Sequence, residues 1–116
     1  MSTPTNTEQC EQRRQRRVKI PQHPQIRDAH SGTVVGQLVN LSVDGLMAVS
    51  PLCISCGTVC QVRIPLIVDD ETVEIQLGIE SLWCEDANES GSHWTGFQII
   101  DVSPDHHRIL RSVIGE

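Results

Sequence analysis

Apolar and polar side chains alternate along residues 72–85, and this alternation constrains the fold more than any other feature of the chain. Val73, Ile75, Leu77 and Ile79 occupy every second position. Successive side chains of a β-strand point to opposite faces. The pattern therefore predicts a long, half-buried strand with its polar residues outward.

Other segments also predict strands, each bounded by turn-forming residues. Residues 58–68 carry apolar side chains mostly at every second position. Residues 18–27 alternate only loosely, and Pro21 and Pro24 interrupt them. Because proline cannot donate to a β-ladder, residues 18–27 predict an edge strand or an irregular first strand. Further strands are predicted at residues 33–41, 45–50 and 93–101.

The C-terminal segment has a helical pattern instead. Ser103 is a typical N-cap, Pro104 is typical of the first helical position, and Gly115 is a typical helix end. An apolar stripe at helical spacing is formed by Ile109, Leu110, Val113 and Ile114. Five or six antiparallel strands followed by one short α-helix predict an all-β fold, a small β-barrel with the helix over one end.

Length and composition narrow the class of protein. The 116 residues fit one domain of ordinary size. No stretch approaches the roughly 18 apolar residues of a membrane span, so we expect no membrane insertion. Residues 1–12 are polar and lack the apolar region of a secretory signal, and they predict a flexible N-terminal tail on a cytoplasmic protein.

The net charge of −6 is distributed unevenly. Residues 1–27 carry six basic and two acidic side chains, whereas the rest of the chain carries three basic and thirteen acidic ones. A basic segment on an acidic body indicates a local anion site, and a solvated basic tail is the ordinary alternative. Because the acidic body would repel a long polyanion, we expect neither DNA nor RNA as a partner.

The basic segment is dominated by a cluster of arginines at positions 13, 14, 16 and 17. A guanidinium group presents a planar fork of donors that matches phosphate oxygens or the O6/N7 edge of guanine. It can also stack on a base. Four arginines on a flexible segment could therefore bind a nucleotide that carries both phosphates and guanines.

A second polar motif, residues 40–45, lies between two predicted strands. Asn40 and Ser42 supply an amide and a hydroxyl, and Gly45 either adopts φ > 0 or lets another group approach the backbone closely. The ordinary interpretation is a β-hairpin whose polar side chains satisfy their own backbone.

The two motifs together, in this order and separation, resemble the PilZ domain, the bacterial receptor module for cyclic di-GMP. The resemblance runs from about residue 11 to the C-terminus and implies a six-stranded antiparallel β-barrel with a C-terminal helix over residues 13–116. It implies cyclic di-GMP as the ligand. The ligand-binding residues that it implies are Arg13, Arg14, Arg17, Asn40, Ser42, Gly45 and Trp83.

The resemblance also implies a division of roles. Arg13 and Arg17 clamp phosphate and guanine, and Arg14 makes an accessory contact. We expect Asn40, Ser42 and Gly45 to lie on the barrel surface and to accept the other edge of one guanine. Trp83 lines the site, with core packing as the alternative. The residue before the first arginine is linked in the family to the binding of one ligand or a stacked pair, and Gln12 there leaves the stoichiometry open.

The five cysteines raise the question of metal binding. Cys53, Cys56 and Cys60 have the spacing of a partial metal cluster, but no second pair follows at the usual spacing. A fourth ligand could come from Cys84, His93, His106 or His107. Cys60 lies within a predicted strand, where it packs as a small hydrophobe. The sequence thus favours reduced thiols and no metal.

Enzymatic motifs are missing from the sequence. It has no Gly-rich phosphate loop, nucleophile elbow or His-Glu-x-x-His. His106 and His107 are adjacent on the predicted helix and point in different directions, so they indicate a solvated face. We therefore expect no enzyme activity and no cofactor.

The leading prediction is a cyclic di-GMP receptor that orders its N-terminal arginine arm against the barrel and signals to an unidentified protein effector in trans. The alternative is a β-barrel protein–protein adaptor that binds no nucleotide. In that case the basic arm would dock on an acidic partner.

Overall fold

In the described part of the chain, seven antiparallel β-strands precede one C-terminal helix. The computed structural model describes residues 17–87 and 91–115. The elements are β1 (Val18–Lys19), β2 (Gln25–Asp28), β3 (Val34–Leu41), β4 (Gly45–Ser50), β5 (Val59–Val68), β6 (Glu71–Asp86), β7 (His93–Val102) and α2 (Pro104–Ile114). The predicted flexible tail and Arg13 and Arg14 lie outside the described residues.

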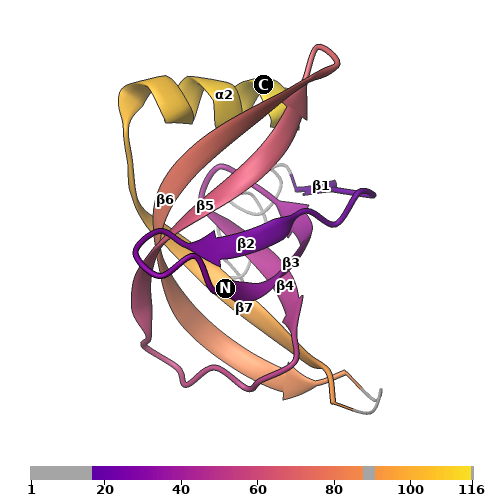
Figure 1. Ribbon diagram of the computed structural model, residues 1–116, viewed down its shortest axis with the longest axis vertical. Coiled ribbons are helices and arrows are strands. Elements are labelled where there is room, and N and C mark those ends of the chain that lie inside the picture. The colour runs from indigo at the N-terminus through magenta and orange to yellow at the C-terminus, as the bar shows by residue number, and fades with distance from the viewer. Residues whose placement is uncertain (1–16, 88–90, 116) are drawn as a thin grey trace, which may run out of the picture.

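The strands close into a barrel (Figure 1). The ladder runs β3-β2-β5-β6-β7-β4, and β4 pairs with β3 again, which completes six strands around the barrel. Closure pairs the two edges that an open sheet would expose. The predicted all-β fold, a six-stranded antiparallel barrel with one C-terminal helix, is confirmed.

The first barrel strand is broken into β1 and β2. Both pieces pair with β3. The strand β1 lies opposite Asn40 and Leu41, and β2 lies opposite residues 34–37. Pro21 and Pro24 lie between the two pieces, where no ladder hydrogen bond is needed from their nitrogens. Of the two alternatives for this segment, the irregular strand is correct. The edge position holds for β1, which pairs with β3 alone, and is wrong for β2, which pairs with both β3 and β5.

The alternation that predicts β6 places its apolar side chains inside the barrel. Ile75, Leu77 and Ile79 are fully buried, and Val62 and Ile64 of the neighbouring β5 face them in the same core. Each such side chain contributes about 1.5–3 kcal/mol relative to an exposed one. The core therefore lies within the barrel. The polar residues that alternate with these apolar positions along β6 lie on the outside of the barrel.

The helix α2 lies across one end of the barrel beside β5 and β6 (Figure 1). Leu110 and Ile114 are its buried residues. The Ser103 hydroxyl accepts a hydrogen bond from the backbone N–H of His106, and Gly115 ends the helix at φ 92°. His106 Nδ1 accepts a 3.0 Å hydrogen bond from the backbone of Gln76, which joins the helix to β6. In the described part of the chain, no helix combines the length and apolar character of a membrane span.

Candidate ligand-binding site

The turn between β3 and β4 is held together by Ser42. Its hydroxyl accepts hydrogen bonds from the backbone N–H groups of Asp44 (3.3 Å) and Gly45 (3.1 Å), and donates one to the Gly45 carbonyl (3.2 Å). Ser42 is only 1 % exposed. The ordinary interpretation of this motif therefore holds for Ser42. The predicted surface position of Ser42 is met only in part, because the residue borders a surface depression while its hydroxyl is directed into the turn.

Gly45 is required by a close approach between strands. It pairs with Gln98 across the β4–β7 ladder, and a Cβ atom added to it would lie 2.6 Å from the Phe97 carbonyl oxygen. Of the two reasons predicted for a glycine here, the close approach is the one that the structure supports. Gly45 is buried beneath the turn, and like Ser42 it reaches the surface only as part of the wall of that depression.

Arg17 connects the two sequence motifs. Pairing of β1 with β3 brings the start of β1 next to the turn, opposite Leu41. The Arg17 side chain is exposed, and its Nη1 donates a 2.8 Å hydrogen bond to Asn40 Oδ1. The arginine motif and the turn motif thus meet through a direct side-chain contact, although they are far apart in the sequence.

Two surface depressions adjoin Arg17. The larger is about 340 Å³ and is lined by Arg17, Ser42, Asp44, Gly45, Leu82, Phe97, Gln98 and Ile99. The smaller is about 180 Å³ and is lined by Arg17, Asn40, Leu46, Met47, Leu82, Trp83, Gly96 and Phe97. They share three lining residues, so they form two parts of one region. Each predicted ligand-binding residue within the described chain lines one of them.

Trp83 lies on the outside of the barrel. Its side chain is 40 % exposed, and it pairs with Gly96 across the β6–β7 ladder. A Cβ atom on Gly96 would lie 2.4 Å from the indole Nε1 and Cε2 atoms, so the ring packs directly on the glycine backbone. Core packing, the alternative considered for Trp83, does not describe this position. The ring offers an aromatic wall beside the Arg17–Asn40 pair.

Several lining residues were not predicted from the sequence. Leu82 lines both depressions and is 47 % exposed, and Asp44 and Gln98 line the larger one. The register between β6 and β7 shifts between Ser81 and Trp83, which marks a β-bulge. Such a bulge puts two consecutive large side chains near one surface. In the sequence, the only local indication of this bulge is the apolar residue directly before Trp83.

The chemistry of the region suits a nucleotide. A guanidinium fork can bind a phosphate or a guanine edge, an amide can pair with a base edge, and an indole ring can stack on a base. Arg17, Asn40 and Trp83 provide one group of each kind around the smaller depression.

The predicted cysteine spacing does not produce one cluster. Cys60 is half-buried on β5, and burial raises the pKa of its thiol. The Cys56 thiol donates a 3.1 Å hydrogen bond to the Leu82 carbonyl. Cys53 instead lies beside Cys84 and His93, which come from β6 and β7. Only one cysteine of the predicted triplet therefore belongs to the group of side chains that the fold assembles.

The fold and this region define a small β-barrel binding module with a C-terminal helix. The PilZ domain family model matches residues 11–116, and the chain belongs to this family of cyclic di-GMP receptors and adaptors. PilZ domains act as binding and adaptor domains. No curated protein matches the chain by sequence.

Among solved structures, the chain is similar to the Bacillus subtilis inhibitor of motility (MotI/DgrA). The two are 13 % identical and superpose with a TM-score of 0.70. The match covers 83 % of this chain and 46 % of the other, so the chain spans less than half of that protein's length. At this identity the likeness concerns the fold.

Proposed function

We propose that this protein is a receptor for cyclic di-GMP that binds the ligand between its N-terminal arginine segment and the turn between β3 and β4. The ligand carries two phosphates and two guanines. It therefore calls for anion binding, base-edge recognition and stacking at the same place. Membership of the PilZ family supports this ligand, and the side chains around the smaller depression supply the three kinds of contact.

The hydrogen bond between Arg17 and Asn40 is the observation that carries the proposal. It holds a guanidinium group over the barrel surface between the two depressions. Ligand binding would add contacts to this bridge and extend them to Arg13 and Arg14, which precede Arg17 in the chain. Ordering of that segment against the barrel would then change the surface offered to a protein partner.

The output of such a signal is also part of the proposal. The similar structure from Bacillus subtilis is described as an inhibitor of motility. Motility is therefore the first process to measure in cells that carry or lack this protein. We propose that the partner is a protein recognised through the rearranged N-terminal segment, without enzymatic activity of the barrel itself.

Calorimetric titration tests the ligand directly. The wild-type protein should bind cyclic di-GMP and neither GMP nor cyclic di-AMP, and the molar ratio should report whether one ligand or a stacked pair enters. Arg17→Ala removes charge-assisted hydrogen bonds worth about 1.5–3 kcal/mol each, which predicts a loss of affinity of roughly 10- to 150-fold per bond. Because Arg17 is exposed, the Arg17→Ala variant should keep the melting temperature of the wild type.

Arg63→Ala is the matched control. Arg63 is an exposed arginine on β5 that lines neither depression. This variant should bind as tightly as the wild type. Equal affinities of all three proteins would contradict the proposed site. Absence of binding by the wild type would favour the adaptor alternative, and the N-terminal segment would then be used to search for an acidic protein partner.

A further inference from the structure

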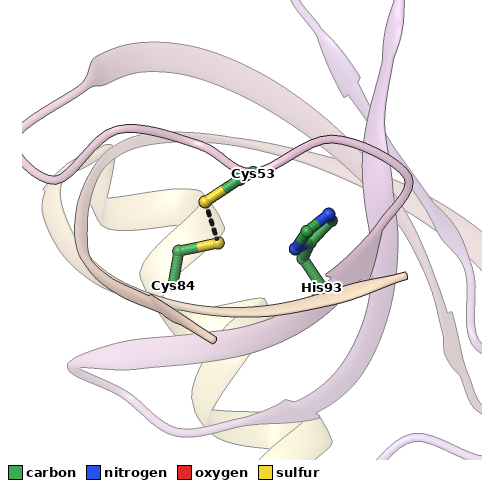
Figure 2. Close-up of side chains that lie close together, drawn as sticks. All are labelled: Cys53, Cys84 and His93. Atoms are coloured by element: carbon green, nitrogen blue, oxygen red, sulfur yellow. Dashed lines mark hydrogen bonds between the residues drawn. The ribbon is translucent and has the colours of Figure 1, made fainter. Parts of the chain in front are cut away.

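Two thiols and an imidazole converge beside the strands β6 and β7 (Figure 2). Cys53 lies in the connection between β4 and β5, Cys84 lies near the end of β6, and His93 begins β7. The Cys53 and Cys84 sulfur atoms are 2.8 Å apart. The two sulfurs and one imidazole nitrogen all lie within 4.8 Å of one another.

Unpartnered polar atoms border this group. Within the described residues, the buried side-chain nitrogen and oxygen atoms without a hydrogen-bond partner are His93 Nδ1 and Thr95 Oγ1. His93 and Thr95 lie opposite Asp86 and Cys84 in the β6–β7 ladder. An Asp86 carboxylate oxygen lies 3.1 Å from His93 Nδ1 and pairs with the ring when the imidazole is protonated, but that carboxylate is almost fully exposed. Among the described residues, the imidazole thus has an exposed ion-pair partner and no hydrogen bond, so it is available as a metal ligand.

We propose that Cys53, Cys84 and His93 bind a thiophilic divalent metal ion of the zinc class. Thiolate and imidazole are the ligands that such ions prefer, and two cysteines with one histidine form a known three-ligand set. The fourth position would take water or the Asp86 carboxylate, which already lies beside the imidazole. This inference does not depend on the proposed nucleotide site.

The geometry needs only a small adjustment to accept the ion. With a zinc–sulfur bond of about 2.3 Å and tetrahedral geometry, two ligand sulfurs lie roughly 3.8 Å apart, so these thiols must separate by about 1 Å. Cys53 is exposed and lies in a connection outside the strands, where such a movement is readily accommodated. A disulfide between the two cysteines is the competing outcome. It would leave His93 out of the linkage, whereas a metal ion uses all three side chains.

A metal ion bound at this site would link two parts of the barrel. The connection that carries Cys53 is tied to β6 by Ser81, whose hydroxyl donates to the Ser55 carbonyl and accepts from the backbone N–H of Thr58. Cys84 directly follows Trp83 on β6. A metal bound between Cys53 and Cys84 would therefore fasten this connection to the strand that forms the aromatic wall of the ligand region.

Metal titration of the reduced full-length protein tests the inference. Zn²⁺ binding is measured by competition with a chromophoric chelator, and Co²⁺ is used as a spectroscopic probe of thiolate coordination. The wild type should take up one ion per chain and show a sulfur-to-cobalt charge-transfer band. Cys84→Ser and His93→Gln should each weaken Zn²⁺ binding by roughly tenfold or more. Circular dichroism establishes that both variants keep the barrel.

The remaining cysteines provide matched controls. Cys56→Ser, Cys60→Ser and Cys10→Ser should bind Zn²⁺ as the wild type does. As a second readout, Zn²⁺ should slow alkylation of Cys53 and Cys84, mapped by mass spectrometry, and leave that of Cys56 unchanged. The inference is overturned if the reduced wild type binds no ion, if Cys56→Ser weakens binding as much as Cys84→Ser, or if Zn²⁺ protects all cysteines equally. A readily formed Cys53–Cys84 disulfide in a protein that binds no metal after reduction would assign the pair to redox chemistry instead.

Discussion

Gly45→Ala is the substitution whose effect follows most directly from the structure. The new Cβ atom would lie 2.6 Å from the Phe97 carbonyl oxygen. Even a favourable carbon–oxygen contact needs about 3.3 Å, so β4 and β7 must separate locally by roughly 0.7 Å. The obstructing atom belongs to the backbone of a ladder that closes the barrel, and no rotamer change can relieve the clash.

The expected magnitude combines two opposing effects. Overpacking of this kind costs about 1–3 kcal/mol. Replacing glycine by alanine also restricts the unfolded chain, which returns about 0.4–1 kcal/mol. The net destabilisation is therefore about 0–2.6 kcal/mol. Its central value of about 1.3 kcal/mol corresponds to a melting temperature lowered by roughly 5–10 °C for a domain of this size.

Thermal unfolding followed by circular dichroism measures this change, with Gly96→Ala as the control. In that variant the new Cβ atom meets the Trp83 ring, which is partly exposed and can swing outward. Gly96→Ala should therefore unfold closer to the wild-type temperature and shift the tryptophan emission. A Gly45→Ala protein that melts above the wild-type temperature would refute the close-approach argument. So would a Gly96→Ala protein that is the less stable of the two.

Three further predictions concern the turn, the aromatic wall and acid stability. Ser42→Ala removes the hydroxyl that holds the β3–β4 turn, which should cost about 1–3 kcal/mol and lower the urea midpoint; an unchanged midpoint would contradict this role. Trp83→Ala should weaken cyclic di-GMP binding by roughly 5- to 150-fold if one base stacks on the ring, whereas Trp94→Phe should bind normally in the same titration. The Asp28 carboxylate accepts hydrogen bonds from the backbone N–H groups of Ser31 and His30, which lower its pKa below the ordinary value of 3.8. The stability that this carboxylate contributes should be present above pH 3.8 and lost as the pH falls through the lowered pKa. Asp28→Asn should remove this part of the pH dependence of the melting temperature. Identical curves of melting temperature against pH for the wild type and the variant would contradict this role.

Most of the fold could be predicted from local patterns. The alternation of Ile75, Leu77 and Ile79 identifies β6, because a strand with one buried face must place apolar residues at every second position. The N-cap Ser103 and the terminal Gly115 delimit α2, because orphan backbone groups at helix ends require such residues. The first strand was only half predictable. Its prolines predict an interruption of the strand, but the pairing of β2 with β5 depends on closure of the whole barrel.

The sequence predicted which residues belong to the candidate ligand site better than it predicted how they are arranged. The spacing of Asn40, Ser42 and Gly45 indicated a polar turn, yet only the structure distinguishes an exposed amide from a buried hydroxyl that serves the backbone. Leu82 was missed, because a β-bulge and not the strand period places it beside Trp83. Ligand binding by these residues stays a prediction.

The sequence by itself determined the strands, the helix and the presence of two polar motifs, since these depend on neighbouring residues and on the period of the backbone. The tertiary structure decided which distant side chains meet. Pairing of β1 with β3 brings Arg17 to Asn40. The connection between β4 and β5 passes over the paired strands β6 and β7, and this joins Cys53 to Cys84 and His93 and not to Cys60. Such contacts depend on ladder register, and a shift of one residue moves every side chain of a strand to the other face.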